Sequence, residues 1–162
     1  MKYRNSGSGL IAVQELQYVI QAEYRSLIYA QRLLQLAPPE HRPYFIRHME
    51  VKQKERLANW TRLYYHQTAC YPVFSKVEPP RDYVSGLKAS IMDALDASDL
   101  YAELLDGVQD PELRQMMQRA MIGESRWALR QQFMYSSYIL ENSDMAKGKG
   151  LIGVIKKQLP PG

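Results

Sequence analysis

The sequence predicts an all-α protein: a four-helix bundle made of two helical hairpins joined by a long crossover. Three observations support this prediction. Apolar residues recur at steps of three and four along four long segments, and no segment shows the alternation of a β-strand. Prolines and glycines separate the segments. Two short connections flank one long middle connection, which is the order expected for two hairpins and a crossover.

The first helical hairpin is expected between about residues 10 and 68. Its first helix runs from about Leu10 to Leu36 and stops at "APPEH", where two prolines end it. Its second helix runs from about Pro43 to Thr68. The next stretch, "ACYPVFSKVEPPRDY", is too long and too rich in proline for a tight helical turn, so we expect it to form the crossover.

The second hairpin is expected between about Val84 and Leu140. Its helices, 84–105 and 111–140, are divided by "DGVQDPE", in which Asp110 suits the N-cap and Pro111 the first helical position. Residues 1–9 contain "NSGSG" and residues 141–162 contain "KGKG", so both ends are expected to be flexible. Residues 10–140 then form one folded domain.

Charge and composition exclude several classes of partner. The chain has 162 residues and a sequence pI near 9.1, but residues 145–162 hold four lysines and no acid. The remainder is formally neutral, with no basic face to follow a phosphate backbone, so we expect no nucleic-acid partner. No apolar run approaches the roughly 20 residues of a membrane span, so we expect no stable membrane insertion. A single cysteine fits a reducing compartment, and we expect a cytoplasmic location.

Polar residues interrupt the inward apolar stripes of three helices at the same height. Glu23 occupies the middle of the first stripe, in "VIQAEYRSLIYAQ". The other members of that stripe are apolar: Leu16, Ile20, Leu27, Ala30 and Leu34. The second helix offers Gln53 and Arg56, and the fourth offers Glu124 three residues before a tryptophan. An ionised carboxylate is costly to bury alone, so a positive charge is expected opposite Glu23.

Several phrases resemble the rubrerythrin-related branch of the ferritin-like superfamily over about residues 10–140. They are "QAEY…LAPPEH", "WTRLYYHQTACYP" and "ALDASDLYAELL…DPELRQMMQRAMIGESRW". The resemblance implies a di-iron or di-manganese oxidoreductase. Such a site takes a Glu from each of two helices and a Glu-x-x-His from each of the other two.

The family's ligands can be placed on this chain one at a time. The first-helix Glu corresponds to Glu23, which is present, whereas the second-helix Glu-x-x-His falls on Gln53 and Arg56. The third-helix Glu falls on Ala94, which cannot bind metal. The fourth-helix motif falls on Glu124 and on Trp127, which replaces the imidazole. Two of the six ligands remain, too few for iron or manganese, so no metal and no cofactor are expected.

The replaced residues suggest what stands in for the metals. Arg56 brings a permanent positive charge, and its planar fork can pair with Glu23, Glu124 or both. Trp127 adds bulk where Ala94 removes it, which keeps the layer filled. The hypothesis is that Glu23 is tolerated because Arg56 supplies the charge that metals would otherwise supply.

Three classes of function follow. The first is a non-catalytic structural or interaction module that forms a homodimer or binds another protein through a face the sequence does not identify. The second is a divergent iron or manganese oxidoreductase, or a single-metal protein using Glu23 and Glu124 with Gln53 or a nearby histidine. The third is a small-ligand binder with a cavity beside Ala94 and Ser98. We expect His48 to lie at the surface or an edge, which argues against its being a ligand.

Overall fold

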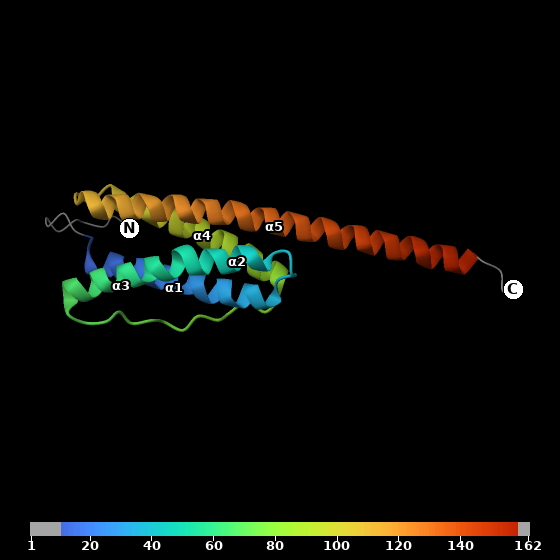
Figure 1. Ribbon diagram of the computed structural model, residues 1–162, viewed down its shortest axis with the longest axis horizontal. Coiled ribbons are helices and arrows are strands. Elements are labelled where there is room, and N and C mark those ends of the chain that lie inside the picture. Colours follow the sequence, from blue (N-terminus) through green and yellow to red (C-terminus); the bar gives the residue numbers. More distant parts are fainter. Residues whose placement is uncertain (1–10, 159–162) are drawn as a thin grey trace.

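The computed structural model describes residues 11–158, with side chains except those of residues 51, 52 and 144–158. Within this range the protein is helical and contains no strand. The elements are α1 (Val13–Leu36), α2 (Arg42–His48), the π-helix η1 (Met49–Gln53), α3 (Lys54–Thr68), α4 (Tyr83–Leu105) and α5 (Pro111–Gln158) (Figure 1). The all-α prediction is therefore confirmed for the described residues.

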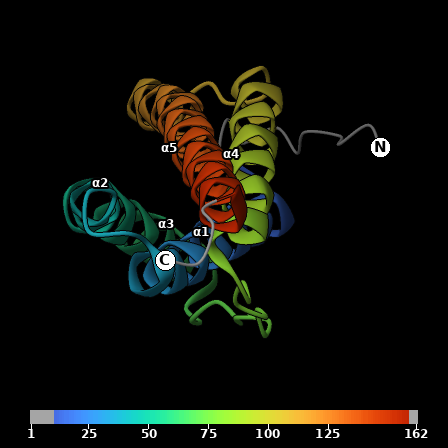
Figure 2. The same ribbon diagram turned by 90° about the vertical axis from the view of Figure 1, so that its right-hand side faces the viewer.

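The helices lie side by side in two layers. Viewed along the long axis, α1 with α2 and α3 forms one layer, and α4 with α5 forms the other (Figure 2). Helix α1 packs against both α3 and α4, and α4 packs extensively along α5. None of the described helices is long and apolar enough to cross a membrane.

The second helical segment differs from its prediction in one respect. A single helix was expected from Pro43 to Thr68, and the structure instead inserts the π-helical turn η1 between α2 and α3. A π-turn holds one more residue than an α-turn, so it shifts the phase of every side chain that follows. Gln53, the last residue of η1, is fully buried, and Arg56 follows it three residues later.

An extended connection, residues 69–82, carries the chain from the end of α3 back along α1 to the start of α4 (Figure 1). The Gln17 side chain donates a hydrogen bond to the Val73 carbonyl at 2.7 Å, and Ser75 N–H donates to the Gln21 side chain at 2.9 Å. The Phe74 ring packs on that of Tyr24 with centroids 4.7 Å apart. These contacts fix a long segment that has no helix of its own.

Helix α5 begins as predicted and ends far beyond its predicted end. The Asp110 carboxylate accepts a hydrogen bond from the Leu113 N–H at 2.7 Å, the N-cap contact expected before Pro111. The expected end at Leu140 is wrong, because α5 continues to Gln158 and extends past the other helices (Figure 1). Residues 141–158, expected to be flexible, are therefore helical. No proline interrupts the chain between Pro111 and Pro160, so no residue in this stretch breaks the helix as a proline would. The expected flexible segment 1–9 lies outside the described residues.

The core consists of two apolar clusters separated by a polar layer. Toward one end, Leu16, Ile20, Trp60 and Met117 belong to the first cluster; toward the other, Leu33, Phe45, Leu87, Trp127 and Met134 belong to the second. Along α1 and α5 the buried acids fall between these two groups. The predicted stripes are largely buried, although near the end of α1 the fully buried residue is Leu33 and the predicted Leu34 is half-buried.

Candidate functional site: a buried ion-pair network

The Arg56 guanidinium lies between two buried carboxylates from different helices. Its Nη2 donates to Glu23 Oε2 at 3.0 Å, and its Nε is 3.0 Å from Glu23 Oε1, so the fork faces the carboxylate of α1. The same Nη2 also donates to Glu124 Oε1 on α5. The exposed fractions are 13% for the Arg56 side chain, 3% for Glu23 and 1% for Glu124. Arg56 thus pairs with both acids, one of the arrangements the sequence predicts.

Tyr101 completes the network from α4. Its hydroxyl donates to Glu23 Oε1 at 2.5 Å. Burial, followed by the negative charge of Glu23, raises the pKa of Tyr101 well above its ordinary value, so the hydroxyl stays protonated and remains a donor. Steps of four and three from Ala94 through Ser98 put this tyrosine on the inward stripe of its helix, but they indicate no partner for it.

One positive charge stands against two negative ones in this layer. Burial alone would lower the pKa of Arg56, but the attraction of Glu23 and Glu124 outweighs it, and the net effect raises that pKa. Burial raises the pKa of Glu124 to about 7, against the lowering influence of Arg56 and with a further increase from Glu23. A proton on Glu124 therefore removes the excess charge near neutral pH.

Gly123 makes room for the guanidinium. A Cβ atom at position 123 would lie 2.9 Å from Arg56 Nη1, closer than such contacts allow. Glycine within a helix costs about 1 kcal/mol relative to alanine. The close approach of Arg56 gives a physical reason for glycine at this point of α5.

The structure places all six positions that match the family's ligand pattern in the interior. Ala94, Gln53 and Trp127 are buried together with the two acids, and Arg56 is nearly so. Neither amide atom of Gln53 has a hydrogen-bond partner among the described residues, and the same holds for Glu124 Oε2. The layer therefore contains buried polar atoms beyond those that the ion pairs use.

Two histidines at the ends of α2 are buried. His48 was expected at the surface or an edge, and this is wrong, because it is buried and its ring stacks on Trp127 with centroids 3.9 Å apart and planes at 7°. His41 is buried as well, with Nδ1 2.8 Å from the Tyr83 hydroxyl oxygen. The π-turn η1 follows His48 directly, and sequence periodicity gave no signal for it.

A second ion pair, between Arg25 and Asp93, was missed by sequence analysis. It joins α1 to α4, with the aspartate buried and the arginine 40% exposed. Burial raises the pKa of Asp93, and Arg25 acts in the opposite direction. The sequence signal for this pair is Asp93 itself, an acid directly before Ala94 and one position from the inward stripe.

The residues of the layer do not fit a di-metal centre. A guanidinium lies between the two acids, and the positions of two other ligands carry an alanine and a tryptophan. Among the side chains that the structure describes, no group of three or more His, Cys, Asp or Glu residues is arranged to hold a metal ion. The donors present are carboxylate and amide oxygens, which are already partly engaged by Arg56 and Tyr101.

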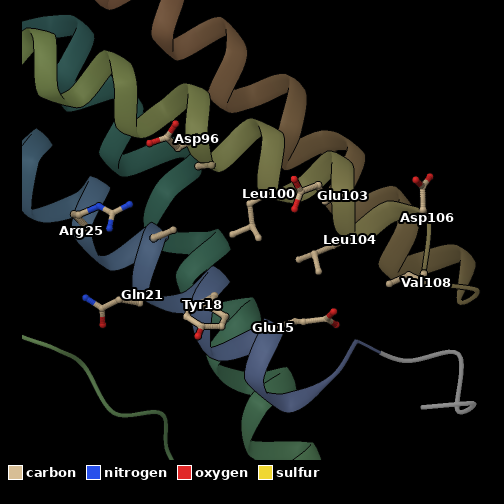
Figure 3. A pocket seen from close by; sticks show the side chains of 13 residues that line it. Glu15, Tyr18, Gln21, Arg25, Asp96, Leu100, Glu103, Leu104, Asp106 and Val108 are labelled. Atoms are coloured by element: carbon tan, nitrogen blue, oxygen red, sulfur yellow. The ribbon is translucent and has the colours of Figure 1, made fainter. Parts of the chain in front are cut away.

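Two clefts border this region. The larger, about 690 Å³, lies between α1 and the end of α4, with Leu100 and Leu104 pointing toward α1 and Glu15, Glu103 and Asp106 around them (Figure 3). None of the six predicted positions lines it. A cleft of about 610 Å³ between α3 and α5 does reach the network, because Arg56 and Gly123 form part of its wall.

Comparisons with known proteins show similarity of fold. No family model matches the chain, and no curated protein matches it. A solved structure that does match is that of a conserved hypothetical protein, rv2844, from Mycobacterium tuberculosis. The TM-score is 0.67 at 10% sequence identity, over 79% of this chain and 98% of that one. At this identity the likeness shows the fold alone.

Proposed function

We propose that this chain is a non-catalytic, ferritin-like four-helix bundle, related to the rubrerythrins, whose di-metal layer is filled by protein groups. Its two helical hairpins are α1 with α2–α3 and α4 with α5, and residues 69–82 are the crossover. Its role is that of a structural or interaction module that binds a second copy or another protein. The order of the helices and the inward position of all six ligand-equivalent residues support this proposal.

The observation that carries the proposal is the position of Arg56. A di-metal site offsets buried carboxylates with the charge of its ions. Here the guanidinium contacts Glu23 and Glu124 directly, so the protein supplies that positive charge itself. A ligand set that lacks both imidazoles and has an internal cation between its acids is poorly suited to iron or manganese.

Elemental analysis tests the proposal. The full chain is expressed with added iron and manganese, purified without chelators and measured by mass spectrometry of its metals. We expect well below one metal ion per chain. Stoichiometric iron or manganese that is lost in the Glu124→Gln variant would favour the divergent metalloprotein instead.

A reconstituted variant supplies the positive control. It combines Gln53→Glu, Arg56→His, Ala94→Glu and Trp127→His, which restores the family's ligand pattern at every altered position. We expect this variant to take up two metal ions per chain. If circular dichroism shows it folded and it binds none, the match between these positions and the family's ligands is wrong.

A further inference from the structure

Four large apolar side chains are exposed along one side of α5. Ile122 is 47% exposed, Leu129 72%, Phe133 65% and Leu140 65%. At about 100° of rotation per residue, the four positions fall within about 40° of one another around the helix. We call these four residues the outer stripe.

Most of the outer stripe faces away from the rest of the chain, and Ile122 at its start also borders the cleft between α3 and α5. The buried residues of α5, such as Met117, Glu124 and Gln131, lie on the opposite side of the helix. Helix α4 contacts one flank of α5, where Ser125 and Ser98 are hydrogen-bonded, and Arg56 of α3 reaches the other flank. No described part of the chain buries the outer stripe, and a contiguous row of large apolar residues in water favours association.

The spacing of the outer stripe is the same in both directions. Its members are separated by seven, four and seven residues. We propose that two copies of the chain pair through the outer stripe, with α5 antiparallel to α5 and the two-fold axis level with Gln131. Ile122 then lies level with the partner's Leu140, and Leu129 with the partner's Phe133. Each apolar residue thereby gains an apolar counterpart, as a symmetric interface requires.

One pair of opposite charges beside the outer stripe fits the antiparallel direction, and Arg130 on the same flank lies over the Tyr44 ring of its own chain, 5.7 Å from the ring centroid. Arg119 stands near the stripe's beginning and Glu141 near its end, both exposed and on the same flank by helical rotation. In an antiparallel pair, Arg119 of one copy lies near the partner's Glu141. A parallel pair would place the two copies of this flank on opposite sides of the interface, so the contact between Arg119 and Glu141 would be lost.

The long extension of α5 fits the same register. Residues 145–158 hold four lysines and no acid, and this part of α5 extends past the helices of its own chain (Figure 1). In the proposed pair, this segment of one copy runs beside the partner's turn between α4 and α5. That turn carries Asp106, Asp110 and Glu112, all of them exposed. The most basic segment of the chain therefore lies beside an acidic turn of the other copy.

Sedimentation of the full chain over a range of concentrations tests the pairing. We expect a dimer whose dissociation constant rises at least tenfold when Leu129→Asp and Phe133→Asp are combined. The matched control is Val73→Asp, which changes a 76% exposed valine in the connection on the other side of the molecule (Figure 1). Circular dichroism checks that each variant is folded. A wild-type monomer at every concentration, or a folded double variant that dimerises like the control, would overturn the proposal.

Cysteine cross-linking tests the register. In a Cys70→Ser background, we expect Ile122→Cys and Leu140→Cys chains to form a mixed disulfide on gentle oxidation. Ile122→Cys alone should form little, because two such residues would stand about 27 Å apart along the helix axis. The reverse result would refute the antiparallel register.

A vesicle-binding assay tests the other occupant of an exposed apolar face. If the protein is a monomer that binds vesicles, and if Leu129→Asp with Phe133→Asp abolishes that binding, the outer stripe belongs to a membrane surface and the pairing is wrong.

This pairing names a second copy of the chain as the partner of the interaction module proposed above, and it rests on that proposed role. It uses no residue of the ion-pair network, so sedimentation and metal analysis report on the two proposals separately. A metal-loaded protein that still dimerises through α5 would refute the non-catalytic role and leave the pairing intact.

Discussion

Replacing Arg56 with leucine tests the physical basis of the polar layer. The substitution keeps an apolar stem of similar bulk near Gly123 but leaves the carboxylates of Glu23 and Glu124 without their cation. Both acids are almost completely inaccessible to solvent, so water cannot replace the lost charge. Breaking a buried ion pair by removing one partner typically costs about 3–5 kcal/mol. We expect Arg56→Leu to lower the free energy of unfolding by that amount at pH 8.

The assay is urea unfolding followed by circular dichroism, with Arg62→Leu as the matched control. Arg62 lies on α3 as well, but it is exposed, and its Nη1 donates to the Asn59 side-chain oxygen at 3.2 Å. Its substitution should change stability by no more than about 0.5 kcal/mol. Adding Glu23→Gln and Glu124→Gln to Arg56→Leu should recover much of the loss, because both uncompensated charges are then gone.

The charge argument also predicts how the loss depends on pH. Burial raises the pKa of Glu124 to about 7, and Arg56→Leu removes an influence that lowers it, so Glu124 binds a proton at pH 5 and the substitution should be less destabilising there than at pH 8. A loss below about 0.5 kcal/mol at pH 8 would mean that the guanidinium does not balance buried charge. A loss that is large but equal at both pH values would assign the effect to packing instead.

Three further predictions concern the same layer. The pKa of Glu124 rises from 4.5 to about 7 on folding, so the stability that this group contributes is fully present below pH 4.5 and is lost as the pH rises through 7. The loss is about 3 kcal/mol, and denaturation of Glu124→Gln from pH 5 to 8 should show a correspondingly flatter profile. Gly123→Ala should destabilise the fold despite alanine's better helix propensity, because its Cβ would displace Arg56; a higher melting temperature would contradict this. Tyr101→Phe removes the donor to Glu23 and should cost about 1.5–3 kcal/mol in urea unfolding, whereas an unchanged midpoint would show that this bond is not stabilising.

The sequence was sufficient for the elements whose limits depend on local chemistry. The paired prolines after Leu36 and the Asp110–Pro111 pair mark a helix end and a helix start that the structure reproduces within a few residues. Neither signal depends on what packs nearby. The fully buried Leu33 shows the limit, since steps of three and four are both compatible with a helical stripe and only packing chooses between them.

Features that depend on contacts between helices were not predictable in the same way. The sequence "MEVKQ" contains ordinary helix-forming residues, so nothing local marks η1 as a π-turn. The pair of Arg25 with Asp93 requires knowing how α1 is rotated against α4. The sequence predicts too short an α5 because the glycines and lysines after Leu140 indicate a flexible segment, whereas no proline interrupts the helix between Pro111 and Pro160.

The candidate site was predictable because burial of a charge restricts its possible partners more strongly than burial of an apolar residue does. Once Glu23 was assigned to an inward stripe, only a cation, a proton or a metal could stand opposite it, and Arg56 was the cation at the same height. The pairing of Arg56 with the acids does not, however, account for all the charge in the layer. One guanidinium cannot neutralise two carboxylates, so the layer also needs the hydroxyl of Tyr101 and a proton on Glu124. The difference between a metal centre and this network is therefore one of charge: two divalent ions balance the four acids of a complete site, whereas a single arginine brings less positive charge than two acids carry and leaves the remainder to proton binding.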